Sequence, residues 1–143
     1  MMRVLGLLSL LLIVTGLPAA ADTLAGRVVG VHDGDTLTLL VAGNQPVKVR
    51  LAGIDAPELS QPYGQQAKQA LSALAFRKAA RVESPGPDKY GRTLGVVMVG
   101  TVNVNAELVK QGAAWVYRSY PFPPALEGLE AQARAAKRGL WAL

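Results

Sequence analysis

The chain has 143 residues, with 15 Lys and Arg against 10 Asp and Glu, and it contains no Cys. This length provides for one domain with one hydrophobic core, and the absence of Cys excludes disulfides, thiol catalysis and cysteine-ligated metal centres. The basic balance suits a polyanionic partner, although many basic proteins have none.

Residues 1–21 have the pattern of a secretory signal peptide. Arg3 precedes the apolar run VLGLLSLLLIVTGL, and the small residues of PAAAD follow it, so we expect cleavage after Ala21. The run is shorter than the roughly 20 residues of a membrane-spanning helix, and an uncleaved anchor is the alternative. We therefore expect residues 22–143 to form one secreted or periplasmic domain without stable membrane association.

Strand patterns come first in the remaining chain. Apolar residues alternate with polar ones over 26–31, 36–42 and 47–52, and the turn-rich stretches HDGD and GNQP separate these runs. The period then changes, because Ala67, Ala70, Leu71 and Leu74 recur at helical spacing. We expect a meander of three strands followed by an amphipathic helix over 65–76.

The second half mixes strands and helices. Strand patterns over 80–84 and 93–99 flank PGPDKYG, whose two Pro and two Gly predict an irregular loop. Helices are expected over 105–111, ended by Gly112, and over 126–138, ended by Gly139. Together these elements predict an α+β fold that is mainly β, with a five-stranded Greek-key barrel as the leading candidate.

Acidic residues gather at the ends of neighbouring predicted strands: Asp33, Asp35, Asp55 and Glu58. If the first three strands pair in order, Asp35 and Asp55 lie close together, on loops outside the core. Two such carboxylates predict a site for a hard divalent cation such as Ca²⁺ or Mg²⁺. The alternative is an ordinary Asp-Gly hairpin with solvated acids. Asp33 either sets this turn or holds a metal-bound water.

Two arginines accompany these acids. Arg50 alternates with Val49 and Leu51 and so points away from the core, where it needs solvent or a carboxylate. Arg92 closes DKYGR, for which the alternative is a tight turn with Gly91 at positive φ and a solvated Arg. Paired arginines beside metal-binding acids are typical of phosphoryl chemistry.

The motifs VHDGDTLTL, VRLAGIDAPE, DKYGRTLGVV, VNAELVKQGAAWVY and EAQARAAKRGLW resemble those of the thermonuclease (staphylococcal nuclease-like) family, in their order and approximate spacing. The resemblance runs from about Gly26 to Trp141. It implies an OB-fold with five strands and about three helices. It also implies Ca²⁺-dependent hydrolysis of DNA and RNA to products that end in 3′-phosphate, by a protein that we expect to be a monomer.

The resemblance also implies a role for each matching residue. Asp35, Asp55 and the main-chain carbonyl of Ala56 would bind Ca²⁺, Arg50 and Arg92 would hold the scissile phosphate, and Glu58 would orient or deprotonate the attacking water. Lys89, Tyr90, Tyr117 and Tyr120 would contact the nucleotide, although for the last two a structural role is an equal alternative. The family pattern has Thr where this chain has Ala56, a change that a backbone ligand survives.

Two rival functions stay open. An OB-fold can bind single strands without catalysis, although such domains lack the acids and arginines present here. The short segment LSQPYGQQ after Glu58 leaves little room for a DNA-binding loop, so a phosphodiesterase on small nucleotides is the second rival. Trp115 and Trp141 are expected to pack, and His32 is expected to take no part in the chemistry.

Overall fold

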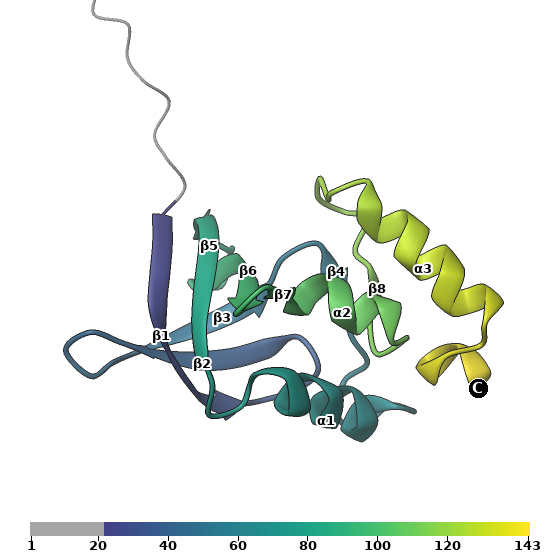
Figure 1. Ribbon diagram of the computed structural model, residues 1–143, viewed down its shortest axis with the longest axis horizontal. Helices are drawn as coiled ribbons and strands as arrows, with labels where there is room; N and C mark the ends of the chain where they lie inside the picture. Colours follow the sequence, from purple (N-terminus) through teal and green to yellow (C-terminus); the bar gives the residue numbers. More distant parts are fainter. Residues whose placement is uncertain (1–21) are drawn as a thin grey trace, which may run out of the picture.

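The computed structural model describes residues 22–143, so the predicted signal peptide lies outside the described residues. These residues form eight strands, three α-helices and a short 3₁₀ helix, which Figure 1 shows in chain order. The elements are β1 (Asp22–Val31), β2 (Thr36–Val41), β3 (Gln45–Leu51), β4 (Ile54–Asp55), α1 (Gly64–Ala75), β5 (Ala79–Pro87), β6 (Thr93–Val99), β7 (Val102–Asn103), α2 (Val104–Lys110), β8 (Trp115–Val116), α3 (Ala125–Ala135) and η1 (Gly139–Ala142).

Five of the strands close into a barrel. The sheet has the order β3-β2-β1-β5-β6-β7, and a parallel pairing of β3 with β6 joins its two sides. The other ladders in this sheet are antiparallel, while β4 and β8 form a separate small pair. The predicted five-stranded barrel with about three helices, an OB-fold, is confirmed. Figure 1 shows α1 at one end of this barrel and α3 on its far side, beyond α2.

The core follows from the alternation in the strands. Leu37 and Leu39 in β2 and Val49 and Leu51 in β3 are fully buried, while Lys48 between the last two is exposed. The buried face of α1 includes Leu71, and the helix closes one end of the barrel. Helix α2 packs on β6, and α3 packs on α2 and β8 rather than on the barrel itself. No helix among the described residues is long and apolar enough to cross a membrane.

Three predicted boundaries are wrong. Strand β1 begins at Asp22 instead of at 26, because its first four residues pair with β5. Strand β5 continues to Pro87 instead of ending at 84, because a bulge between Glu83 and Gly86 lets the ladder resume. Helix α3 ends at Ala135, not at Arg138, because Lys137 adopts a φ of 51° and the Arg138 N–H bonds back to the carbonyl of Ala133. The predicted loop therefore shrinks to the residues between β5 and β6.

Asn105 joins the two strands whose parallel pairing closes the barrel. Its side chain is buried; its Oδ1 accepts the N–H of Val97 at 3.1 Å, and its Nδ2 donates to the carbonyls of Ala52 at 2.9 Å and Gly95 at 3.2 Å. Ala52 follows β3, and the other two partners lie in β6. One amide thus satisfies three backbone groups at the barrel seam.

We predict that Asn105→Ala lowers the free energy of unfolding by about 2–4 kcal/mol, because it leaves buried backbone groups without partners. The matched control is Asn103→Ala, which removes the α2 cap bond to Ala106 N–H and should cost only about 1 kcal/mol. Urea denaturation measures both. A cost for Asn105→Ala no larger than that of Asn103→Ala would contradict this account of the seam.

Candidate active site

The turn between β1 and β2 places the first acidic residues. Asp33 Oδ1 accepts the N–H of Asp35 at 3.0 Å, so Asp33 sets the turn. Gly34 packs tightly here, since a Cβ at this position would lie 2.7 Å from the Cβ of Ala56 and 2.8 Å from that of Ala67. The absence of a side chain at Gly34 therefore lets the turn sit directly against the segment that carries Asp55 and Ala56.

Arg50 and two carboxylates form the centre of the site. Its Nη2 lies 3.4 Å from Asp35 Oδ2 and 3.3 Å from Asp55 Oδ1. The N–H of Ala56 donates to the same two oxygens, at 2.9 and 3.0 Å. The structure therefore brings Asp35, Arg50, Asp55 and Ala56 together, and the arginine finds carboxylates rather than solvent.

Asp35 is more buried than we expected. Its side chain is 9% exposed, so the expectation that it lies outside the core is wrong. The turn is folded under Arg50 and against Ala56, which removes it from solvent. The pKa of Asp35 is raised to about 7, mainly because the carboxyl group is buried; Arg50 opposes this rise and the neighbouring Asp33 adds to it. Burial therefore makes a negative charge at this position costly.

A second turn, between β5 and β6, places Arg92. Asp88 Oδ1 accepts the N–H groups of Tyr90 and Arg92, both at 2.9 Å, and Oδ2 accepts Arg92 Nε at 2.7 Å. Gly91 has a φ of 78°, as the tight-turn alternative expected. That alternative also expected Arg92 to be solvated, but its guanidinium is bound by Asp88.

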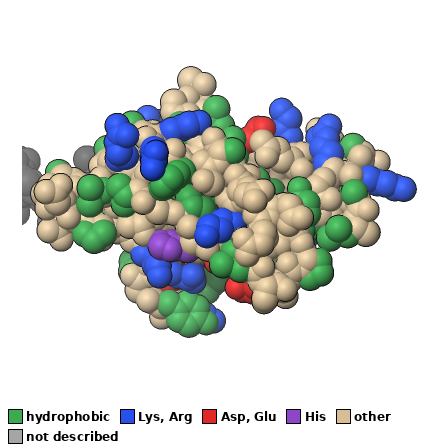
Figure 2. Space-filling model, turned by 90° about the horizontal axis from the view of Figure 1, so that it is seen from below, with side chains coloured by type: hydrophobic (Ala, Val, Ile, Leu, Met, Phe, Trp, Pro, Cys, Tyr) green, Lys and Arg blue, Asp and Glu red, His purple; other side chains and the backbone are tan. Residues whose placement is uncertain are grey.

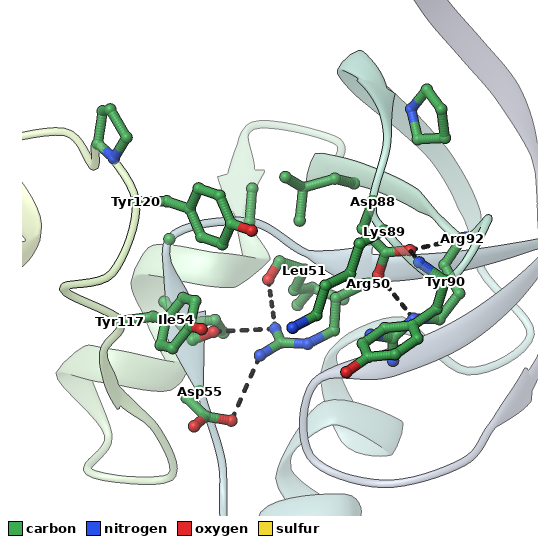
Figure 3. A pocket seen from close by; sticks show the side chains of 15 residues that line it. Arg50, Leu51, Ile54, Asp55, Asp88, Lys89, Tyr90, Arg92, Tyr117 and Tyr120 are labelled. Carbon is green, nitrogen blue, oxygen red and sulfur yellow. Dashed lines mark hydrogen bonds and ion pairs between the residues drawn. The ribbon is translucent and has the colours of Figure 1, made fainter.

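A cavity of about 430 Å³ lies between residues 50–55, the β5–β6 turn and the segment after β8. Figure 3 shows its lining, to which Arg50, Asp55, Lys89, Tyr90, Arg92, Tyr117 and Tyr120 contribute. The rings of Tyr117 and Tyr120 lie 5.7 Å apart on one side, and the Lys89 ammonium and Arg92 guanidinium lie 5.0 and 5.3 Å from the Tyr90 ring on the other. All four predicted nucleotide contacts therefore border one cavity.

Glu58 does not line this cavity. Its side chain is exposed, but its backbone is fixed: its N–H donates to Gln61 Oε1 at 2.7 Å, and its carbonyl accepts the Gln61 N–H at 2.9 Å. A Cβ at Gly64 would collide with the same carbonyl, so this glycine allows the loop to close. The role predicted for Glu58 stays a prediction, with its main chain held and its carboxylate in solvent.

The available oxygens suit a hard cation. No cluster of three or more His, Cys, Asp or Glu that could hold a metal occurs in residues 22–143, so the candidate site offers two carboxylates and main-chain or water oxygens. Arg50 and Ala56 engage one oxygen of each carboxylate, which leaves Asp35 Oδ1, beside the Thr36 hydroxyl at 3.2 Å, and Asp55 Oδ2. This donor set fits Ca²⁺ or Mg²⁺. His32 instead bonds Thr38 Oγ1, at 2.7 Å.

The sequence did not predict a buried carboxylate behind the site, paired with exposed arginines. Glu130 in α3 accepts the N–H of Val116 at 2.6 Å and Nη2 of Arg118 at 2.9 Å, while Arg134 lies 3.8 Å away. The sequence shows the i, i+4 spacing of Glu130 and Arg134. It gives no sign of the contact between Glu130 and β8, whose Val116 is fourteen residues away. Because β8 pairs with β4, this contact supports the strand that carries Asp55.

Comparisons with known proteins agree with this geometry. A family model described as staphylococcal nuclease homologue matches residues 48–143. The chain is 49% identical over 137 residues to an uncharacterized endonuclease of Haemophilus influenzae, covering 95% of this chain and 77% of the relative. It is 41% identical over 140 residues to a micrococcal nuclease of Shigella flexneri, with 90% and 79% covered, and 44% identical over 144 residues to Protein ParB of Escherichia coli, with 93% and 80% covered.

We predict that the Glu130 ion pair stabilises the protein in a pH-dependent way. Burial alone would raise the pKa of Glu130, but the bonds from Arg118 and Val116 outweigh it and hold the pKa below its ordinary value of 4.5. The stabilisation is therefore complete above that value and is lost as the pH falls through the lowered pKa.

Urea unfolding of the parent and of Glu130→Gln, followed from about pH 7 to about pH 3, measures this contribution. The variant should be less stable near neutrality, and the difference should shrink in acid. Arg134→Ala is the control, because this exposed arginine approaches the same carboxylate but not β8, and it should change little. A difference that is constant with pH would refute the assignment.

Proposed function

The chain belongs to the staphylococcal nuclease homologue family, and from this premise we propose that it is a Ca²⁺-dependent nuclease that hydrolyses DNA and RNA to products ending in 3′-phosphate. One observation carries the proposal. Two arginines, a lysine and two carboxylates line a single cavity, and a third carboxylate, that of Asp35, lies 3.4 Å from Arg50. A polyanion with a reacting phosphate needs this combination of cations, acids and concave shape.

Asp35, Asp55 and the carbonyl of Ala56 would hold the cation. The two carboxylates share the Ala56 N–H as a donor, so they lie close enough to act on one ion. When bound, a divalent cation neutralises charge on the phosphate as the reaction proceeds. The family's Thr at position 56 is Ala here, but a main-chain carbonyl supplies the same oxygen from either residue.

Arg50 and Arg92 would bind the phosphate from two sides of the cavity. Each guanidinium is already oriented, Arg50 by the carbonyls of Leu51 at 2.6 Å and Ile54 at 2.9 Å, and Arg92 by Asp88. Oriented donors need little rearrangement when charge develops on the phosphate oxygens, although Arg50 would exchange one of its present contacts for the phosphate. Lys89 and Tyr90 would contact the nucleotide on one side, and Tyr117 and Tyr120 would stack on a base on the other.

Glu58 would act on the attacking water. Its fixed backbone limits where the carboxylate can reach, while its exposed side chain is in contact with solvent. A positioned carboxylate of this kind orients or deprotonates a water molecule.

We also propose that the protein acts outside the cytoplasm, as a monomer, after cleavage behind Ala21. The arginine, apolar run and small residues of the first 21 positions support this proposal. N-terminal sequencing of the exported protein tests it, and an intact Met1 on membrane-bound protein would refute it.

One experiment tests the proposed activity against its rivals. The purified domain is incubated with plasmid, single-stranded DNA, RNA and a dinucleotide, each with Ca²⁺ and with a chelator. Cleavage of the polymers only with Ca²⁺ is the expected result, and end-group analysis should find 3′-phosphate. Binding without cleavage would identify a binding module, and cleavage of the dinucleotide alone would identify a phosphodiesterase for small substrates.

We predict that Glu58→Gln lowers turnover by roughly 10²-fold or more while nucleotide binding persists, because a positioned acid or base contributes about 10²–10⁴ to rate. Gln keeps the size and the hydrogen bonding but cannot accept the proton. Steady-state kinetics in saturating Ca²⁺ measures the effect. A folded Glu58→Gln protein that cuts DNA at the parent's rate would end this assignment.

Arg92→Lys is the companion variant. Lysine keeps the charge but loses the planar fork, so turnover should fall more than affinity if Arg92 serves the transition state. Equal losses in turnover and affinity would instead mean that Arg92 serves ground-state binding only.

A further inference from the structure

The protein groups of the site have no excess of positive charge of their own, and the divalent cation proposed above would add only two charges. The two turns and the cavity together hold three positively charged side chains and four carboxylates. Each of the two arginines already forms an ion pair with an acid. These groups are Arg50, Lys89 and Arg92 against Asp33, Asp35, Asp55 and Asp88. Since a long polyanion is attracted by net positive charge, a surface outside the cavity must supply much of that attraction.

Lys48 adds a positive charge beside the site, on the outer face of the barrel. It lies two residues before Arg50 in β3, on the same face, and is exposed. The parallel register of Val49 with Thr93 puts it alongside the start of β6, next to Arg92. Within residues 22–143, no carboxylate lies in ion-pair distance of Lys48.

The next two strands carry small, neutral hydrogen-bonding groups on this face. Thr38 in β2 pairs with Lys48 on one side and with Gly30 of β1 on the other. The Thr38 hydroxyl bonds His32 Nε2 at 2.7 Å, and the imidazole is exposed. Because Gly30 has no side chain, nothing projects from the sheet at this position, and a bound nucleic-acid strand can lie close to the backbone.

A second group of cations lies where β1 meets the start of β5. The backbone of Val28 bonds to Arg77 and Lys78 at 2.9 and 3.0 Å, and Arg27 Nη1 donates to the Arg77 carbonyl at 2.8 Å. All three basic side chains are exposed, and among the described residues none pairs with a carboxylate. Lys78 Nζ also donates to the Ala73 carbonyl, at 3.1 Å, near the end of α1.

We propose that these residues form an outer-face track that binds the phosphates of a nucleic-acid strand beyond the cavity. The track comprises Lys48, Thr38, His32, Arg27, Arg77 and Lys78. It crosses β3, β2 and β1 to the start of β5, three strand spacings or about 14 Å, which several nucleotides can span. Binding on the face of strands 2 and 3 is also the general habit of OB-folds. Figure 2 shows the histidine of this face with Lys and Arg side chains near it and a second basic group beyond.

This inference rests on the proposed function. Ligands of two lengths test it separately, because a dinucleotide reaches only the cavity, whereas a dodecanucleotide also reaches the outer-face track. Binding of a dinucleotide and of a thymidine dodecanucleotide is measured by fluorescence anisotropy in chelator, which prevents cleavage. The variant Lys48→Gln/Arg77→Gln should weaken dodecanucleotide binding by about tenfold at low salt and leave dinucleotide binding within about twofold. The slope of log affinity against log salt should fall by about 1.4, because each single-strand phosphate contact contributes about 0.7.

The matched control is Lys110→Gln/Lys137→Gln, which removes two exposed positive charges at the ends of α2 and α3. It should change dodecanucleotide binding by less than about threefold. Equal losses in the two double variants would overturn the track, because the effect would then be one of net charge alone. An unchanged salt slope would overturn it too, as would a loss of binding to anionic lipid vesicles with no loss for the oligonucleotide.

Arg77 and Lys137 have φ values of 64° and 51°, so their substitution carries a risk for folding that Lys48→Gln on an exposed strand does not. The single variant Lys48→Gln should show half the change in salt slope, and no change there would refute the proposal. If the proposed nuclease activity is wrong, the parent protein binds the oligonucleotide in chelator but does not cleave it in Ca²⁺. That outcome is distinct from a failure of the track.

Discussion

The guanidinium of Arg50 is the group on which the geometry of the site depends. Its two terminal nitrogens contact the carbonyls of Leu51 and Ile54 and the carboxylates of Asp35 and Asp55, so it joins the end of β3, the short β4 and the β1–β2 turn. A partly buried arginine and two acids are costly to desolvate alone and tolerable only together. Arg50 also lies in the strand that closes the barrel, paired with Thr36 on one side and Leu94 on the other. Closure of the sheet therefore assembles the site.

The tyrosine side of the cavity is held in place by residues that do not line the cavity. Tyr117 follows β8, whose pairing with β4 is fixed from behind by the carboxylate of Glu130. The Tyr117 N–H also bonds the carbonyl of Gly53, at 3.0 Å, so the tyrosine side of the cavity is tied to the turn that carries Asp55. Helix α3 thus contributes to the site without lining the cavity, because it supports β8, which precedes Tyr117 and pairs with the cavity-lining β4.

Patterns set by local chemistry were readable from the sequence. The alternation in β2 and β3, the helical spacing of Ala67 and Leu71, and the glycine turn after Asp33 each have a physical cause within a few residues, and each prediction is confirmed. The errors arose where contacts between residues far apart in the sequence determine the local structure. The β5 bulge depends on its partner strand, the burial of Asp35 depends on Arg50 and Ala56, and the contact of Glu130 with β8 has no sequence period. Lys137 at positive φ is a further case, since lysine rarely ends a helix in this way.

The two arginines of the cavity are held differently, and this suggests a division of their roles. Arg50 has both terminal nitrogens engaged by protein oxygens, and its side chain is 13% exposed. Arg92 is 28% exposed and is held by Asp88 through Nε alone, so in the described part of the chain its terminal nitrogens have no hydrogen-bond partner. A bidentate grip on a phosphate needs two free N–H groups in one plane. Arg92 offers such a pair without breaking any contact, whereas Arg50 must exchange a carbonyl or carboxylate for the phosphate. Arg50 is therefore primarily the group that organises the site, and Arg92 the one better prepared to meet a substrate.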